Sequence, residues 1–303
     1  MNKYRLHAYL EMLGVSIIWG IAASVIKFTL QGISTVPFLT YRFGLAAIFG
    51  LLFILYKREN IFKGLSNFLE LTLYGVLVSS VSLGLLFWGL EKTTVVEETL
   101  ITATTPLVTA IFGVLLLREH VTKRERIGTT IAFLGTLFVI LEPLLNHGLK
   151  EVHVMGNVLV FLYVVVTAVA SIMAKRLLRS GISAITLTNF GFIAGFVSMS
   201  AFSYFTGQGL FPISEVINLP VKYHLGVIYM ALISGTLGFF LWNAAQKTIE
   251  VGEAALFSYL LPIFSIPVAV FWLGEEITIP FVVGAIIVAV GVAIAELKGK
   301  SYN

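Results

Sequence analysis

The sequence predicts an all-α membrane protein in which ten transmembrane helices form two inverted repeats of five helices. Hydrophobic residues make up 58% of the 303 residues and charged residues only 12%, whereas a soluble domain carries roughly 25% charged residues. Apolar stretches recur along the whole chain, each close to the about 20 residues that a helix needs to cross a bilayer. The second half of the chain also repeats polar, glycine and proline positions of the first half.

Ten apolar stretches bounded by charges or turn residues are predicted to span the membrane. Their approximate ranges are 8–29, 36–56, 69–90, 95–117, 127–145, 155–174, 184–206, 224–245, 252–272 and 280–297. The longest connection, between Thr206 and His224, holds two glycines and two prolines. Since ten spans use about 200 residues, we expect short loops and no soluble domain at either end.

Positive charges predict the orientation of the spans, because cytoplasmic loops carry an excess of Lys and Arg. The connections on the side of both termini hold most of the 20 Lys and Arg residues, whereas those on the other side hold only Lys92, Lys150 and Lys222. Both termini are therefore expected in the cytoplasm. The chain is expected to be a multi-pass protein of the cell membrane, that is, the plasma or inner membrane.

An internal repeat relates the third to fifth predicted helices to the eighth to tenth. The matched positions, in chain order, are Ser80 with Ser234, Gly84 with Gly238, Trp88 with Trp242, Pro106 with Pro262, Glu119 with Glu275, Thr122 with Thr278, Gly128 with Gly284, and Gly135 with Gly291. The predicted units are residues 1–147 and 148–303. Because each unit has an odd number of helices, the second unit must enter the membrane from the opposite side. Inverted repeats of this kind are typical of alternating-access transporters, whose substrate site lies near the midplane.

These features resemble the drug/metabolite transporter superfamily, and specifically its EamA-type members. The resemblance rests on Trp19 and Lys27 in the first helix, Arg42 in the second helix, and the two copies of a Pro-(twelve residues)-Glu-x-x-Thr motif. It covers roughly residues 8–297. It implies a ten-helix exporter or exchanger of amino acids or related metabolites, with a cavity between the halves. The second half departs from the pattern, since Phe190 stands near the position that corresponds to Arg42.

Two proline-containing helices are the best candidates to line such a cavity. Thr102 and Pro106 lie on one helical face, and Ser258 and Pro262 repeat this pattern with Tyr259 beside it. A proline leaves the carbonyl four residues earlier without its backbone donor, and in a membrane such a group needs a protein partner or a wet cavity. Two interpretations remain. Either the prolines are hinges in a cavity wall, or nearby hydroxyls satisfy the kinks and the helices only pack.

Arg42 and Lys27 are cationic residues within predicted spans, and an ionisable residue there predicts function. The guanidinium of Arg42 could bind a substrate carboxylate through paired hydrogen bonds, or it could pair with Glu97 or Glu98. Lys27 lies closer to a helix end and could reach the interface. The neutral candidates for substrate binding are Trp19, Ser16, Ser80, Tyr163, Asn189 and Ser234. The remaining tryptophans, Trp88, Trp242 and Trp272, are expected as interfacial anchors.

The composition argues against catalysis and against pumping driven by ATP. The chain contains no cysteine, each of its 16 acidic residues is glutamate, no two histidines lie at i and i+4, and no Gly-x4-Gly-Lys phosphate loop is present. We expect no enzyme activity, cofactor, metal or nucleic-acid partner. The expected function is secondary active transport of small metabolites, namely amino acids or other carboxylate-bearing solutes, by alternating access. The alternatives are an exporter of cationic drugs and a non-transporting channel or structural subunit.

The expected partners are a small-molecule substrate, the lipid bilayer, and a coupling proton or counter-substrate. A homodimer is a further expectation. Gly128 and Gly135 in the fifth helix, and Gly284 and Gly291 in the tenth, are spaced to lie on one helical face and allow close helix contact. The fifth and tenth helices are therefore predicted to pack or to dimerise, with little role in the cavity.

Overall fold

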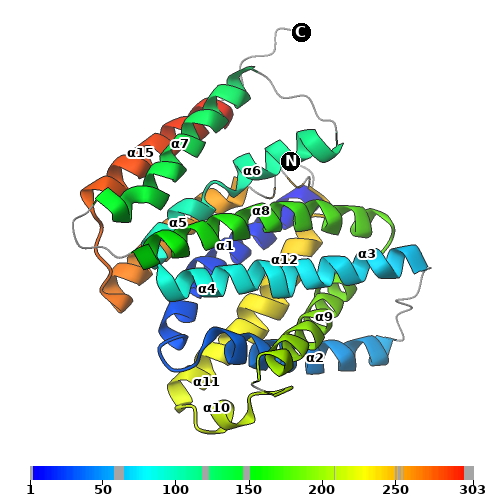
Figure 1. The fold of residues 1–303 in the computed structure, drawn as a ribbon. Coiled ribbons are helices and arrows are strands. Elements are labelled where there is room, and N and C mark those ends of the chain that lie inside the picture. Colours follow the sequence, from blue (N-terminus) through cyan, green and yellow to red (C-terminus); the bar gives the residue numbers. More distant parts are fainter. Residues whose placement is uncertain are drawn as a thin grey trace.

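The computed structural model describes residues 3–57, 65–117, 123–145, 151–207, 209–249, 251, 254 and 256–296. These residues form helices joined by short turns and contain no β-strand (Figure 1). Glu119 and Thr122, which belong to the first copy of the repeated motif, lie outside the described residues.

In the described residues, each predicted span corresponds to one helix or to a series of helical segments. The first half contains α1 (Lys3–Thr29), α2 (Thr35–Lys57), α3 (Leu65–Gly75), η1 (Val76–Leu83), α4 (Gly84–Lys92), α5 (Val95–Thr102), α6 (Thr105–Leu117) and α7 (Lys123–Leu145). The second half contains α8 (Glu151–Arg179), α9 (Ala184–Phe205), α10 (Ile213–Ile217), α11 (Val221–Ile228), η2 (Tyr229–Leu237), α12 (Gly238–Ala245), η3 (Leu256–Leu260), α14 (Leu261–Val268), η4 (Ala269–Leu273) and α15 (Ile279–Glu296). Among the described residues, six helices are long and apolar enough to cross a membrane, and shorter apolar helices follow at Phe257–Leu273 and Ile279–Gly291. Only the short helix α10, in the long connection, had no sequence prediction.

Irregular helical segments occur at positions that the sequence repeat pairs. The π-helical segment η1 contains Ser80, and the π-helical segment η2 contains its partner Ser234. The turn between α5 and α6 precedes Pro106, and the 3-10 segment η3 precedes Pro262. Segments of π-helix inside α-helices are rare and are found frequently at functional sites. The paired segments η1 and η2 therefore direct attention to the residues around them, and a third π-helical segment, η4, follows α14.

Helices α7 and α15, which are the predicted fifth and tenth spans, pack side by side at one edge of the molecule, where α7 also contacts α5 and α8 (Figure 1). Their glycines explain the close approach. A Cβ atom at Gly135 would lie 2.9 Å from the Ile287 side chain, and one at Gly291 would lie 2.3 Å from the Ala132 backbone nitrogen. The prediction that these glycines allow close packing is confirmed, and the packing joins two helices of the same chain. The remaining helices enclose the polar interior.

Candidate functional site

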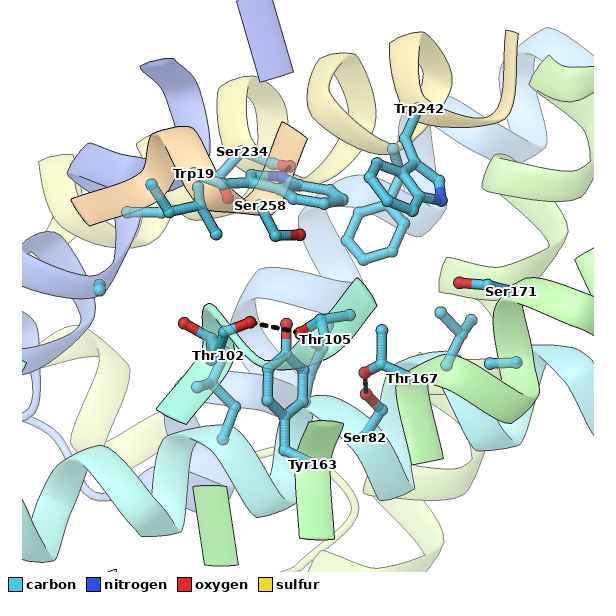
Figure 2. Close-up of a pocket in the computed structure, with 18 of the residues that line it drawn as sticks. Trp19, Ser82, Thr102, Thr105, Tyr163, Thr167, Ser171, Ser234, Trp242 and Ser258 are labelled. Carbon is cyan, nitrogen blue, oxygen red and sulfur yellow. Dashed lines mark hydrogen bonds between the residues drawn. The ribbon is translucent and has the colours of Figure 1, made fainter. Parts of the chain in front are cut away.

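A cavity of about 100 Å³ lies in the interior and is lined by residues from both halves of the chain (Figure 2). Its polar and aromatic lining consists of Trp19, Arg42, Tyr74, Ser82, Glu98, Thr102, Thr105, Tyr163, Thr167, Ser171, Ser234, Phe239, Trp242 and Ser258. A water molecule needs about 10–15 Å³ of such space, so the cavity has room for several waters or a small metabolite. Figure 2 shows Trp19, Ser234 and Ser258 on one wall, facing Thr102 and Tyr163 on the other.

Among the predicted substrate-binding residues, five line this cavity: Trp19, Arg42, Thr102, Tyr163 and Ser234. The other four, Ser16, Ser80, Asn189 and Tyr259, are not in its lining. Ser16 donates a hydrogen bond to the Phe257 carbonyl at 3.2 Å. Ser80 bonds the Ser198 hydroxyl at 2.5 Å, Asn189 packs against Gly50 of α2, and Tyr259 lies next to the lining residue Ser258 in η3.

The two predicted hinge prolines each lie in the first turn of a helix that follows an interruption. Pro106 is the second residue of α6, and Pro262 is the second residue of α14. Proline is well tolerated there because the first-turn N–H groups have no intrahelical acceptor. The Thr102 carbonyl, which Pro106 leaves without a backbone donor, accepts a hydrogen bond from the Thr105 hydroxyl at 2.5 Å. The Thr105 hydroxyl therefore supplies the hydrogen bond that this carbonyl lacks. Thr102 and Thr105 also line the cavity.

Trp19 forms an aromatic wall with Trp242 and Phe239. Its indole Nε1 donates a hydrogen bond to the Ser234 carbonyl at 3.1 Å, and its ring lies 5.2 Å from Trp242 and 5.1 Å from Phe239. The expectation that Trp242 is an interfacial anchor is wrong, because the side chain faces the interior, is buried and pairs with Trp19. Trp272 has the exposure expected of an anchor, at 47%.

Arg42 of α2 is 1% exposed and lies close to two aromatic rings. Its guanidinium carbon is 5.4 Å from the ring centre of Phe43 and 5.3 Å from that of Phe87, so cation–π attraction helps to hold the charge. Within the part of the chain that the structure describes, Nε and Nη1 have no hydrogen-bond partner and no carboxylate forms an ion pair with this residue. The alternative pairing of Arg42 with Glu97 or Glu98 is therefore not made.

Glu98 of α5 supplies the acidic group of the cavity lining and is 7% exposed. It receives a hydrogen bond from the Thr99 hydroxyl at 3.3 Å. On the facing helix α8, Tyr163 and Thr167 also line the cavity, and the Thr167 hydroxyl bonds the Ser82 hydroxyl at 2.6 Å (Figure 2). One cavity thus contains a buried cation and a buried carboxyl group that do not pair with each other.

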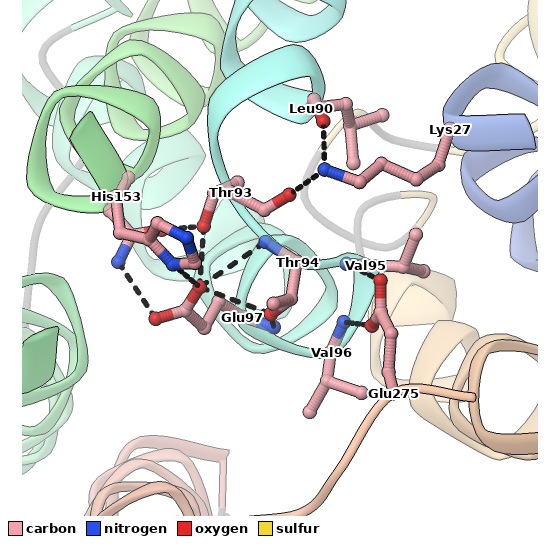
Figure 3. Close-up of polar contacts among 10 residues, drawn as sticks. Lys27, Leu90, Thr93, Thr94, Val95, Val96, Glu97, His153 and Glu275 are labelled. Carbon is pink, nitrogen blue, oxygen red and sulfur yellow. Dashed lines mark hydrogen bonds and ion pairs between the residues drawn. The ribbon is translucent and has the colours of Figure 1, made fainter. Parts of the chain in front are cut away.

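Lys27 lies outside the cavity and closes the end of a helix. Its Nζ donates to the Leu90 carbonyl at 2.7 Å and to the Thr93 carbonyl at 2.5 Å, at the C-terminus of α4 (Figure 3). A cation at a helix C-terminus is stabilised by the free carbonyls and the helix dipole. Lys175, its sequence match in the second half, makes the same contact at the end of α12, where Nζ donates to the Gln246 carbonyl at 2.6 Å and the Ile249 carbonyl at 2.7 Å.

The N-terminus of α5 is held by two glutamates (Figure 3). Glu97 forms a capping box with Thr94 and also receives a hydrogen bond from Asn157 at 3.2 Å. Glu275 reaches from the turn before α15 and accepts hydrogen bonds from the Val95 and Val96 amides at 2.8 and 2.9 Å. Burial raises the pKa of the Glu275 carboxyl, although the two amides act in the opposite direction. The second half of the chain thereby caps a helix of the first half.

Residues 6–141 and residues 154–296 each match the EamA-like transporter family. The chain belongs to this family. It is similar to two proteins of Bacillus subtilis (strain 168): "Uncharacterized transporter YyaM", 28% identical over 98% of this chain and 97% of that protein, and "Uncharacterized transporter YetK", 27% identical over 98% and 89%. An "Uncharacterized transporter" of Archaeoglobus fulgidus is 26% identical over 92% and 95%.

A crystal structure with 16% identity superposes with a TM-score of 0.62 over 98% of this chain and 97% of that one, which supports the fold. This EamA-like chain is therefore a multi-pass membrane protein of a transporter family.

Several lining residues of this EamA-like chain escaped the sequence prediction. Thr167 and Ser171 follow the predicted residue Tyr163 at steps of four residues, so their shared helical face could have been found from the sequence. Glu98 was considered only as a partner for Arg42, because it is close to the predicted start of a span. The place of Tyr74 in the lining becomes evident only from the packing.

Proposed function

We propose that the chain is a secondary active transporter of small carboxylate-bearing metabolites, amino acids among them, and that it works by alternating access. Arg42 carries this proposal, because its buried guanidinium lines the cavity while Nε and Nη1 lack a partner among the described residues. A buried donor without an acceptor costs about 1–3 kcal/mol, and a charged one more. A substrate carboxylate would remove that cost through the paired hydrogen bonds that a guanidinium favours.

Glu98 makes amino acids the preferred members of this class. An amino acid carries a carboxylate and an ammonium group, and the cavity offers Arg42 for the first and Glu98 for the second. The aromatic pair of Trp19 and Trp242 would contact the side chain. Glu98 also favours a second candidate, an exporter of cationic compounds, in which the carboxylate binds the substrate and Arg42 does not.

The proposed setting is the cell membrane, with both termini in the cytoplasm and with export or exchange as the direction of transport. The excess of Lys and Arg on the side of the termini supports this orientation. A homodimer through α7 and α15 stays a prediction. Such a dimer would use faces other than that of Gly135 and Gly291, whose contacts already lie between these two helices.

A thermal-shift screen of the purified protein tests the proposal. The probes are the common L-amino acids, nucleosides, organic anions without an amine, and quaternary amines. A ligand at one hundred times its Kd stabilises the native state by about 2.7 kcal/mol. The protein is compared with Arg42→Lys, which keeps the charge but loses the planar fork. The matched control is Arg176→Lys, which changes an exposed arginine of α8.

We expect amino acids to raise the melting temperature of the wild type and of Arg176→Lys. For Arg42→Lys we expect an at least tenfold weaker affinity, so that an at least tenfold higher amino-acid concentration is needed for the same rise. Stabilisation by quaternary amines alone, with Arg42→Lys responding like the wild type, would replace the carboxylate proposal by the cationic one. A low melting temperature of Arg42→Lys without ligand would instead assign Arg42 a purely structural role.

A further inference from the structure

Glu98 differs from the two other glutamates near the N-terminus of α5 in what surrounds it. Glu97 accepts hydrogen bonds from Thr93 and Asn157 and forms the capping box of the helix. The Glu275 carboxylate is bound by two backbone amides. Among the described residues, the Glu98 carboxyl group contacts hydroxyls and forms no ion pair, and it lines the cavity. Glu97 and Glu275 hold the helix, whereas Glu98 faces the space that a substrate would fill.

The charged and titratable groups around Glu98 come from four elements. Arg42 of α2, Tyr74 of α3 and Tyr163 of α8 share the cavity lining with it, and Glu275 adds a nearby negative charge from the turn before α15. The lining residues of α1 and α14 are not ionisable. Burial disfavours the charged form of a carboxyl group, and a neighbouring carboxylate adds to this effect. The start of a helix and the hydroxyl of Thr99 act in the opposite direction.

We propose that Glu98 is a proton-binding site that couples proton movement to transport through the cavity. In the empty, closed cavity the carboxyl group carries a proton, which avoids an unpaired buried carboxylate. When an amino acid enters, its ammonium group takes the place of the proton at Glu98. The O–H bond of the carboxyl group breaks, and the proton passes to water on the side to which the cavity is open. Substrate and proton therefore compete for one site, and competition of this kind exchanges one for the other across the membrane.

This inference rests on the proposed function, since it assigns a role to the acidic residue of the cavity whose basic residue, Arg42, is proposed to bind the substrate. Its support is that Glu98 and Arg42 line the same cavity, while neither forms an ion pair among the described residues. Arg42 and Glu98 would each be satisfied by the matching group of a zwitterion. The charges of the site would sum to zero in two states. In one, Glu98 is neutral and Arg42 holds an anion. In the other, Glu98 is ionised and the two residues hold a zwitterion.

Infrared difference spectroscopy of the purified full-length protein tests the proton site without a substrate. The carbonyl stretch of a protonated carboxyl group is recorded at neutral pH in wild type, Glu98→Gln and Glu97→Gln. We expect the band in wild type and in Glu97→Gln, and its loss in Glu98→Gln, which keeps the size and polarity of the side chain. A wild-type spectrum that Glu98→Gln leaves unchanged overturns the proposal. Melting temperatures of the variants establish that each is folded.

Ligand addition tests the exchange. The common L-amino acids are expected to remove the Glu98 band and to release one proton for each bound molecule into a weakly buffered solution. Propionate, which lacks the ammonium group, should leave the band in place, and its removal by propionate would overturn the competition. Amino acids that stabilise the wild type through Arg42 but release no proton would leave the proposed function standing and overturn this inference. A Glu98 band that no amino acid changes, in a protein that no amino acid stabilises, would instead overturn the proposed function and the exchange together.

Discussion

Replacing Gly238 by alanine should disrupt the aromatic wall of the cavity. A Cβ atom at this position would lie 2.7 Å from Nε1 of Trp19, where 3.4 Å or more is ordinary contact, so the indole must move. Its hydrogen bond to the Ser234 carbonyl, now 3.1 Å long, would be lost. Overpacking costs about 1–3 kcal/mol and a hydrogen bond about 1 kcal/mol, while alanine regains about 1 kcal/mol over glycine in a helix. The expected net loss of stability is therefore about 1–3 kcal/mol.

The repeat supplies the matched control for this change. Gly84 is the sequence partner of Gly238, and a Cβ atom there would meet Trp88 at 3.3 Å, at the outer edge of the ring. Gly84→Ala should therefore stay within about 1 kcal/mol of wild type. Thermal unfolding in one detergent compares the two variants, and tryptophan fluorescence, to which all four tryptophans contribute, compares the surroundings of their indoles. The reasoning is refuted if Gly238→Ala is at least as stable as Gly84→Ala.

Three further predictions concern the helix ends and the topology. Lys27→Met and Lys175→Met should each lower the melting temperature, since each removes charged hydrogen bonds worth about 1.5–3 kcal/mol; unchanged melting of either variant would contradict the capping role. Burial raises the pKa of Glu275 above 4.5, so the folded state keeps this proton to higher pH than the unfolded state. In thermal melts, the wild type should therefore lose stability relative to Glu275→Gln as the pH rises above 4.5. A difference between the two proteins that does not change with pH would refute this. Because the chain has no cysteine, Ser180→Cys should react with an impermeant reagent only from the cytoplasm and Asn218→Cys only from outside, and labelling of both from one side would refute the proposed orientation.

The helices could be predicted well from the sequence because the lipid bilayer restricts which chain segments can cross it. A chain segment that crosses a membrane must be long, apolar and helical, so the spans could be read from composition alone. The packing of α7 on α15 could also be predicted, since Gly135 and Gly291 leave space on one face. The π-helical segments were beyond such reasoning, because the difference between π- and α-helix depends on tertiary contacts.

The cavity was predicted less completely, because a polar side chain in a span can face a cavity or another helix. Ser80 and Ser234 occupy paired positions, yet Ser234 lines the cavity and Ser80 bonds Ser198 on α9. The same difficulty applies to Trp242, whose position near the helix end is also typical of an anchor. Hydropathy gives the depth of such a residue but not the direction in which it points.

The two halves share their framework but not their charges, and this difference bears on how transport would work. Lys27 and Lys175 cap the C-terminal ends of two equivalent helices, α4 and α12, in the same way. Arg42 and Glu98, in contrast, both belong to the first half, and the positions that correspond to them hold uncharged residues, with Ala254 in place of Glu98. The second half contributes Ser234, Phe239 and Trp242 to the lining. If the halves move relative to each other, a substrate held by both charges stays with the first half and with Trp19, while Phe239 and Trp242 of the second half move past it. The repeat can thus supply a symmetric movement around a site whose electrostatics come from one half.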